Sequence, residues 1–194
     1  MAKSQTTDQL LKDTAKRIFL KEGRLHATTA DIGKEAGLPR TSVHYYFRTR
    51  DALFKHVFVE ALEDLTEKLN EVIESKLPFR NKIEKYVEIW LKNTLEYPYL
   101  DTFVVTEIIG QRYKPVDRFA SVRMKDFVSQ IRKAMNSGEI GGDDPMQFIL
   151  NLFSLLRYPS VAAPLYKELL GLDEKRYLEL LKKRKKEIVR LLLR

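Results

Sequence analysis

Five hydrogen-bonding side chains cluster between residues 40 and 45 of this sequence: Arg40, Thr41, Ser42, His44 and Tyr45. Their guanidinium, hydroxyl and imidazole groups are donors and acceptors suited to phosphate oxygens and the edges of bases. No carboxylate interrupts the group, although a merely solvated helix face usually carries acid. The pattern therefore indicates a surface that faces a hydrogen-bonding polyanion.

The residues just before this cluster predict a short helix with a defined start and end. Thr28 followed by Asp31 fits a capping box, in which the hydroxyl accepts from the third backbone N–H and the carboxylate reaches back. Ile32 and Ala36 place a small apolar stripe on one face. Gly37 predicts the end of the helix, because glycine adopts the left-handed conformation at little cost.

A second short helix is predicted from Pro39, since proline is tolerated in a first helical turn. Val43, Tyr46 and Phe47 recur at three-to-four spacing and give this helix an apolar face of its own. Two such helices and a tight turn form a helix-turn-helix, whose second helix enters the major groove of DNA. The alternative is an ordinary helical hairpin with a polar outer face.

Residues 28–54, TTADIGKEAGLPRTSVHYYFRTRDALF, closely resemble the DNA-binding domain of the tetracycline-repressor (TetR) family. The resemblance lies in the paired threonines, Asp-Ile, Ala-Gly, the Pro-Arg turn, Tyr-Tyr-Phe, and a basic residue before an acidic one and leucine. It implies a three-helix DNA-binding domain over residues 1–50. A long helix would join it to a helical domain for effector binding and dimerisation over residues 51–194.

The resemblance also assigns roles to individual residues. Phosphate contacts are expected from Thr28, Thr29, Tyr45 and Arg50, and base contacts from Arg40, Thr41 and Ser42. Arg50 has an argument of its own, since a guanidinium beside a helix amino terminus adds to the attraction of that terminus for phosphate.

Two positions depart from the family pattern. Thr41 stands where the family usually has a glycine, and His44 stands where it usually has a tyrosine that contacts the DNA backbone. We hypothesise that DNA affinity is higher at acidic pH, because a protonated His44 gains a charge-assisted bond to phosphate. A neutral packing role for His44 is the alternative.

The first helix is predicted over about Thr7 to Glu22, with Gly23 closing it. It must supply the third wall of the small core, because two helices cannot bury their apolar faces alone. The expected core contacts join Ile18 and Phe19 of this helix to Ile32, Val43 and Phe47.

The composition predicts an all-α protein. The 194 residues are 44% hydrophobic and include only 8 glycines, 7 prolines and no cysteine, and helical periodicity recurs between the breaks. Net charge is +5 over residues 1–56, −3 over 57–173 and +6 over 174–194. A basic amino-terminal part on a slightly acidic body suits a phosphate-binding head. With no signal peptide and no apolar run near 20 residues, a cytoplasmic protein without a membrane span is expected.

Helical periodicity divides the rest of the chain. The expected helices are 51–76, a segment ending near Pro98, 100–113, 116–136, 145–158, where Pro159 and Pro164 interrupt the pattern, and 173–193. The helix that begins at Pro145 has almost no polar face, so we expect a second subunit to cover part of it. By the family resemblance, 145–158 and 173–193 form the homodimer interface.

Family members commonly bind a small effector inside the helical body, and this chain has aromatic residues there. The candidates for an effector pocket are Tyr86, Trp90, Phe103, Tyr113, Phe127 and Phe153, with Phe119 and Phe148 further aromatics in the same region. Core packing is the competing interpretation for each of them. The effector itself is unknown from the sequence.

The sequence contains no catalytic constellation, so we do not expect an enzyme. It has no phosphate-cradling glycine loop, no cysteine nucleophile and no Ser-His-Asp set on one surface. His26, His44 and His56 are 18 and 12 residues apart, which matches no metal pair on a helix face. Neither a metal nor a cofactor is predicted.

The expected partners are therefore an operator in double-stranded DNA, a second copy of the chain and a small effector. The basic run Lys182 to Lys186 could add a second nucleic-acid or anionic-membrane patch, but it also suits the solvated face of the last helix. Two other classes of protein remain open: a helical protein-interaction module without DNA specificity, and a protein that binds anionic membrane surfaces.

Overall fold

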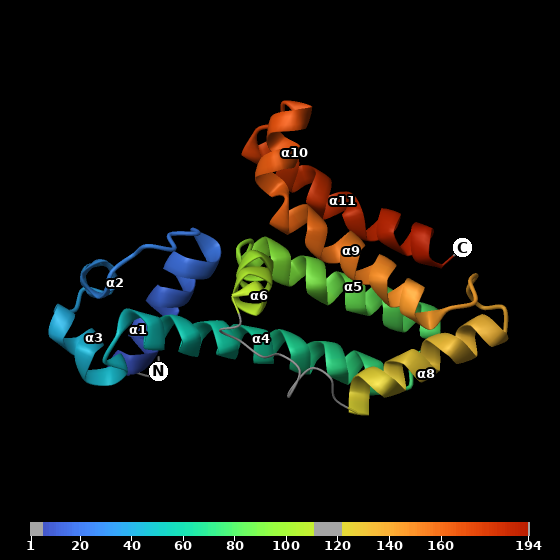
Figure 1. Ribbon diagram of the computed structural model, residues 1–194, viewed down its shortest axis with the longest axis horizontal. Helices are drawn as coiled ribbons and strands as arrows, with labels where there is room; N and C mark the ends of the chain where they lie inside the picture. Colours follow the sequence, from blue (N-terminus) through green and yellow to red (C-terminus); the bar gives the residue numbers. More distant parts are fainter. Residues whose placement is uncertain (1–5, 111–121, 194) are drawn as a thin grey trace, which may run out of the picture. The chain divides into compact units, whose positions relative to one another are not determined.

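The computed structural model describes residues 6–110 and 122–193, and within these ranges it consists of helices and their connections (Figure 1). The α-helices are α1 (Thr7–Lys16), α2 (Thr29–Glu35), α3 (Arg40–Phe47), α4 (Arg50–Glu74), α5 (Phe79–Glu96), α6 (Leu100–Ile109), α8 (Val122–Asn136), α9 (Pro145–Val161), α10 (Ala163–Leu170) and α11 (Glu174–Leu192). The all-α prediction is confirmed. Residues 116–121 of a predicted helix lie outside the described ranges.

The chain forms two compact units, which we call the head and the body. The head contains the described residues up to Asp64 together with Glu96–Leu100, and the body contains Leu65–Leu95 and the described residues from Asp101 onward. The predicted domain boundary after residue 50 differs from this division, which falls within α4. The physical reason is that Leu53, Val57 and other side chains from the first half of α4 are buried in the head.

Four of the five predicted core residues of the head are fully buried: Ile18, Phe19, Ile32 and Val43. Phe47, the fifth, is only half-buried, and its ring contacts His56 of α4 at a centroid distance of 5.8 Å. Tyr46, which was expected on the apolar face of α3, is 44% exposed. The short α3 has only Val43 as a buried residue, so it is held to the head by few contacts.

The first helix is not one regular α-helix to Glu22, as the periodicity predicted. It is α-helical only to Lys16 and continues as a π-helix, η1 (Arg17–Lys21), in which Glu22 N–H donates to the Arg17 carbonyl at 3.0 Å. The wider turn buries three consecutive side chains, Ile18, Phe19 and Leu20. A 3.6-residue repeat could not bury three neighbours on one face.

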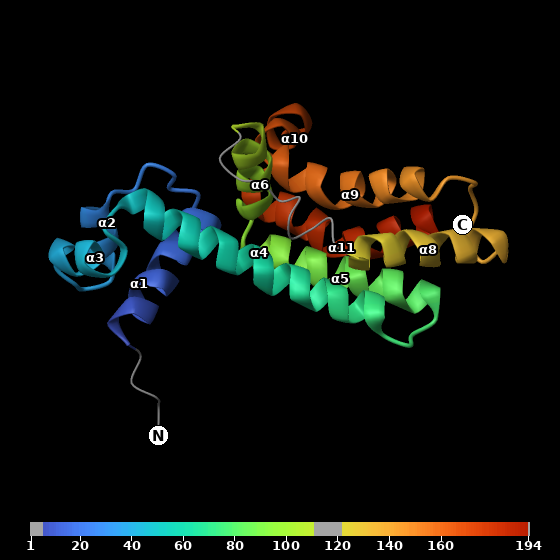
Figure 2. The same cartoon turned by 60° about the horizontal axis from the view of Figure 1, so that its bottom comes forward.

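The body packs α5, α8, α9 and α11 with the second part of α4 around one hydrophobic core. Its fully buried side chains include Ile83, Val87, Ile131, Leu152 and Ile188. Figure 2 shows α9 and α11 running beside each other within this unit. The core uses only the inner faces of these helices, since Met146 and Leu150 of α9 and Leu180 and Leu191 of α11 are about half-exposed.

Pro159 does not interrupt α9, contrary to the prediction, and the helix continues to Val161. A proline has no N–H to donate to the carbonyl four residues earlier, here that of Leu155. Arg184 of α11 supplies the missing donor, because its Nε lies 3.0 Å from the Leu155 oxygen. The central residue of the basic run Lys182 to Lys186 therefore has a structural partner.

The helix α10 was not predicted as a separate element. It follows α9 after a bend of 72° and has no buried residue. Leu165, Leu169 and Leu170 are 50–69% exposed on it. Within the described ranges, no single helix is long and apolar enough to cross a membrane, and only the bent α9–α10 pair reaches that length and apolarity.

Candidate DNA-binding surface

The capping box predicted at the start of α2 is present. The backbone N–H of Asp31 donates to Thr28 Oγ1 at 3.2 Å, and the Asp31 carboxylate accepts from the backbone N–H of Thr28 at 2.8 Å and from its hydroxyl at 2.7 Å. These bonds, that of the backbone N–H first, hold the pKa of Asp31 below its usual range. The helix that precedes the turn is thus defined by its own sequence.

The turn between α2 and α3 brings the two helices very close together. Gly37 adopts φ +68°, and the backbone N–H of Leu38 donates to the Gly33 carbonyl at 2.8 Å. A Cβ atom on Gly33 would lie 2.8 Å from the Leu38 carbonyl oxygen, so only glycine fits at this position. This close approach sets the direction in which α3 leaves the turn.

The structure brings five of the predicted DNA-binding residues onto α3. Arg40, Thr41, His44 and Tyr45 are exposed and Ser42 is half-buried, while Val43 faces the core. Tyr45 is 81% exposed, and its ring makes an edge contact with that of Tyr46 at 5.0 Å. Because the sequence of α3 has no carboxylate, this face presents donors and acceptors without negative charge.

Arg40, His44 and Arg48 form a chain of contacts along α3. Arg40 Nε lies 3.2 Å from His44 Nε2, and His44 Nδ1 lies 2.8 Å from the carbonyl oxygen of Arg48. Arg48 follows the last residue of α3 and has φ +58°, the only positive value outside glycine among the described residues. The sequence-based reasoning assigned no role to Arg48, since a left-handed arginine leaves no local signal.

Arg50 is held by the head itself more closely than the sequence indicated. Its guanidinium donates to the Leu25 carbonyl oxygen, pairs with Asp51 at 2.8 Å, and lies over the Phe19 ring at 4.9 Å and the Phe54 ring at 5.2 Å. The side chain is 31% exposed. A contact from Arg50 to phosphate stays a prediction, and a packing role is now added to it.

The two threonines that begin α2 differ in their surroundings. Thr28 is exposed, and its hydroxyl takes part in the capping box. Thr29 is only 7% exposed, so its hydroxyl is largely removed from solvent. A phosphate contact by the Thr29 side chain remains a prediction, and this burial gives it little support.

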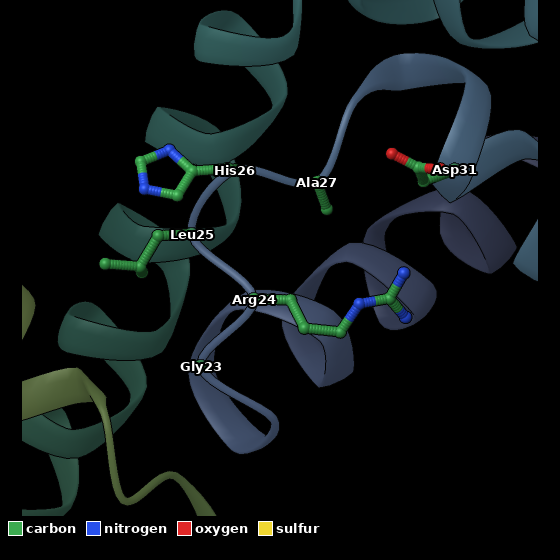
Figure 3. Close-up of a pocket in the computed structure, with 6 residues that line it drawn as sticks. All are labelled: Gly23, Arg24, Leu25, His26, Ala27 and Asp31. Atoms are coloured by element: carbon green, nitrogen blue, oxygen red, sulfur yellow. The ribbon is translucent and has the colours of Figure 1, made fainter.

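A hollow of ≈ 550 Å³ lies on the loop before α2, where Arg24, His26 and Asp31 contribute polar groups (Figure 3). Figure 3 shows the Arg24 and His26 side chains pointing to different sides of the loop. Arg24 pairs with Glu35 at 3.1 Å, which raises the pKa of the guanidinium. Since Arg17 pairs with the same Glu35 at 2.8 Å, these cations are largely neutralised. The hollow is therefore a weaker place for phosphate than α3.

The predicted effector residues lie inside the body. Four of their rings form a row: Phe127 and Tyr86 at a centroid distance of 5.7 Å, Tyr86 and Trp90 at 6.1 Å, and Trp90 and Phe153 at 5.9 Å. Burial raises the pKa of the Tyr86 hydroxyl. Phe103 is buried on α6, whereas Tyr113 and Phe119 lie outside the described residues. These contacts fit core packing as well as the wall of a pocket.

A buried polar network beside this row was not predicted. The Asp101 carboxylate accepts from Ser160 Oγ at 3.1 Å and lies 3.4 Å from Arg157, whose guanidinium covers the Trp90 ring at 4.7 Å. Burial raises the pKa of Asp101, and the charge of Arg157 opposes that shift. The network joins residues 59 positions apart, a separation that local periodicity does not reveal.

Two further polar atoms in this region are buried without a hydrogen-bond partner among the described residues: Trp90 Nε1 and Thr94 Oγ1. The Trp90 indole is near enough to Asp101 to lower the pKa of that carboxyl, so a small shift would pair them. Thr94 has no such neighbour that the structure shows. Unpaired buried polar groups are costly and commonly bind a water or a ligand.

No group of three or more histidine, aspartate or glutamate side chains in residues 6–110 and 122–193 is arranged to hold a metal ion. His26 lies on the loop before α2, His44 on α3, and His56 on α4, where it lies 3.6 Å from Glu60.

An all-α chain with a helix-turn-helix and a polar, acid-free second helix is a DNA-binding transcriptional regulator. Residues 11–57 match the model of the bacterial regulatory proteins of the tetR family. The chain belongs to the TetR family of transcriptional regulators.

Individual relatives are distant. The HTH-type transcriptional regulator YhgD of Bacillus subtilis (strain 168), itself uncharacterized, is 22% identical over 148 residues, which are 71% of this chain and 73% of YhgD. The solved structure of the fatty acid degradation regulator FadR from Bacillus halodurans is similar with a TM-score of 0.66 and 16% identity, covering 99% of this chain and 97% of that one. That of PfmR from Thermus thermophilus gives 0.61 and 16%, covering 97% of each chain. At this identity the two structures show the fold alone.

Proposed function

We propose that the protein is a homodimeric repressor that binds a palindromic operator through α3 and is released by a small effector. The observation that carries the DNA-binding part is the outer face of α3. Arg40, Thr41 and Tyr45 project from it into solvent, and the helix itself carries no carboxylate. A protein of this kind would act in the cytoplasm.

The roles on the DNA follow from exposure and chemistry. Arg40, Thr41 and Ser42 occupy the first turn of α3, the part of a recognition helix that reaches base edges. Tyr45 and Thr28 are placed to contact phosphate from the same side of the turn as a recognition helix would. Arg50 would add positive charge while it stays packed on the head.

A homodimer is supported by the apolar side chains that one chain leaves exposed. Those on the last three helices are Met146, Leu150, Tyr158, Leu165, Leu169, Leu170, Leu180 and Leu191. A monomer rarely exposes so many large apolar residues in neighbouring elements. Two heads about 34 Å apart, or a multiple of that distance, would reach successive major grooves on one face of the duplex.

The effector would bind in the body beside Trp90. The region offers aromatic walls and two buried donors that lack partners, Trp90 Nε1 and Thr94 Oγ1, so it suits an apolar molecule with one hydrogen-bond-accepting group. Because one similar structure is that of a fatty acid degradation regulator, a fatty acid is the first effector to test.

Release of the operator would pass through the chain segments that join the two units. The helix α4 crosses between Asp64 and Leu65, and Glu96–Leu100 belongs to the head although Leu95 and Asp101 on either side belong to the body. An effector that moves Asp101 would pull directly on this segment. Such an effector releases DNA only if it binds the DNA-free form more tightly.

The test is selection of duplexes from a random pool, followed by mobility shifts at several salt concentrations. We expect a palindrome to be selected and its affinity to fall steeply with salt. Arg40→Ala should relax discrimination at its base position, while Lys183→Ala, which removes an exposed charge from the body, should not. Selection of no sequence by the intact dimer would contradict the proposal.

Effector binding has a direct optical readout, because Trp90 is the only tryptophan in the chain. Fatty acids of increasing chain length should change its fluorescence and weaken operator binding over the same concentration range. Thr94→Val, which removes the hydroxyl at nearly constant shape, should weaken the fluorescence response.

A further inference from the structure

We propose that His44 is a positioning residue that holds the Arg40 guanidinium ready to read a base, and that protonation of His44 releases it. The proposal rests on the proposed function of α3 as a recognition helix. It differs from a direct contact between His44 and phosphate, because His44 here acts through Arg40.

The two contacts of the imidazole select one tautomer. The Arg48 carbonyl oxygen can only accept a hydrogen bond, so His44 Nδ1, 2.8 Å away, must carry the proton. The Arg40 Nε–H can only donate, so His44 Nε2, 3.2 Å away, must present its lone pair. Only the neutral Nδ1–H form satisfies both contacts.

The imidazole is itself held on its far side by the backbone. The Arg48 N–H donates to the His44 carbonyl at 3.0 Å, and the Arg48 carbonyl returns to accept from His44 Nδ1. Arg48 has φ +58°, which turns its carbonyl back toward the helix. The ring is therefore clamped by the end of α3 and offers a fixed acceptor to Arg40.

The contact leaves the recognition groups of Arg40 free. Bonding through Nε occupies one side of the guanidinium, and both terminal nitrogens remain available for a bidentate contact with guanine O6 and N7. Arg40 is exposed and would otherwise sample many rotamers. Holding it beforehand lowers the entropy lost when it binds a base.

Protonation reverses the contact. A proton on His44 Nε2 places N–H against N–H and positive charge against the Arg40 guanidinium, while the bond to the Arg48 carbonyl is kept. Arg40 and Arg48 are the charged residues in contact with the ring, and in the described part of the chain no carboxylate forms an ion pair with it. Acid pH should therefore loosen Arg40 while the new charge attracts any phosphate.

The experiment measures discrimination, which is the ratio of dissociation constants for a scrambled duplex and the selected palindrome. It is followed by fluorescence anisotropy from about pH 8 to about pH 5.5, which spans the ordinary histidine pKa. Wild-type discrimination should fall at least about fivefold with acid, in line with loss of one bidentate base contact. Binding of the scrambled duplex should tighten over the same range.

Variants separate positioning from folding. His44→Phe removes both ring contacts and should give low discrimination that no longer changes with pH, as should Arg40→Ala. His44→Gln offers an amide oxygen to Arg40 and should restore discrimination without the pH dependence. His26→Gln, on the loop before α2, is the matched control and should behave as wild type. Circular dichroism and thermal melting check that each variant is folded.

The tautomer gives a readout that does not depend on DNA. Nitrogen-15 NMR of the free protein should show the Nδ1–H form of His44 at neutral pH. An Nε2–H form, or wild-type discrimination that is unchanged by pH and matched by His44→Phe, would overturn the positioning proposal. Failure of the proposed function looks different: wild type would select no duplex at any pH.

Discussion

The ring of Tyr99 lies over Gly23, at the place where a side chain on Gly23 would begin. A Cβ atom there would be 2.5 Å from Tyr99 Cζ, and Gly23 has φ +68°. The backbone N–H of Tyr99 also donates to the Leu20 carbonyl at 3.1 Å. The end of the π-helix η1 thus binds a segment 76 residues further along the chain, and this contact makes Glu96–Leu100 part of the head.

Gly23→Ala should destabilise the protein by about 1–3 kcal/mol, because the left-handed backbone strains alanine and the methyl group displaces Tyr99. Thermal or denaturant unfolding measures the change. Gly37→Ala is the matched control, since Gly37 has the same φ of +68° with nothing within 4 Å of a built Cβ. Equal losses for the two variants would show that the Tyr99 contact contributes nothing.

Arg184→Ala should destabilise the body by about 1–3 kcal/mol, because it leaves the Leu155 carbonyl of α9 without a donor. In a Pro159→Ala background the loss should be smaller, since residue 159 then has an N–H for that carbonyl. Lys183→Ala, next to Arg184 and exposed, should change stability by less than about 0.5 kcal/mol. Strict additivity of the Arg184 and Pro159 changes would refute the shared carbonyl.

Arg50→Lys should destabilise the head by about 1–2 kcal/mol while it keeps the charge. Lysine cannot reproduce the bond to the Leu25 carbonyl together with the stacking on Phe19 and Phe54. Salt dependence of binding to a non-specific duplex should change little, because charge governs it. Arg48→Lys, at an exposed position two residues earlier, is the control for both measurements. A large change in salt slope with unchanged stability would instead favour a purely phosphate-binding Arg50.

Glu88 should show an acid-dependent contribution to stability. Ion pairs with Lys185 at 2.7 Å and Lys85 at 2.9 Å lower its pKa from 4.5 to about 2. Because the folded-state pKa is the lower one, the stabilisation is present above about pH 4.5 and is lost as the pH falls toward 2. The pairs are half-exposed, so Glu88→Gln should cost less than about 1 kcal/mol at neutral pH.

Denaturant unfolding of wild type and Glu88→Gln between about pH 7 and pH 3 measures this difference. The two proteins should converge in stability toward the acid end of the range. A difference that stays constant over the whole range would mean that the ion pairs are not its cause.

The sequence by itself determined the features that depend on neighbouring residues. The capping box of Thr28 and Asp31, the glycine at the turn, and the polar face of α3 all lie within one or two helical turns, where bond geometry and periodicity act directly. The buried positions of Ile18, Phe19, Ile32 and Val43 followed from the same repeat. These features were sufficient to predict the fold class and the helix-turn-helix.

Only the tertiary structure decided the contacts between residues distant in the sequence. Burial of three consecutive residues in η1, the seat of Tyr99 on Gly23, the bond from Arg184 to the Leu155 carbonyl, and the Asp101 network each need a partner from another element. The same holds for the tautomer of His44, because it depends on how the backbone turns at Arg48. Periodicity records which face of a helix is apolar, but it does not record which atoms meet there, since packing depends on shape and on the whole chain.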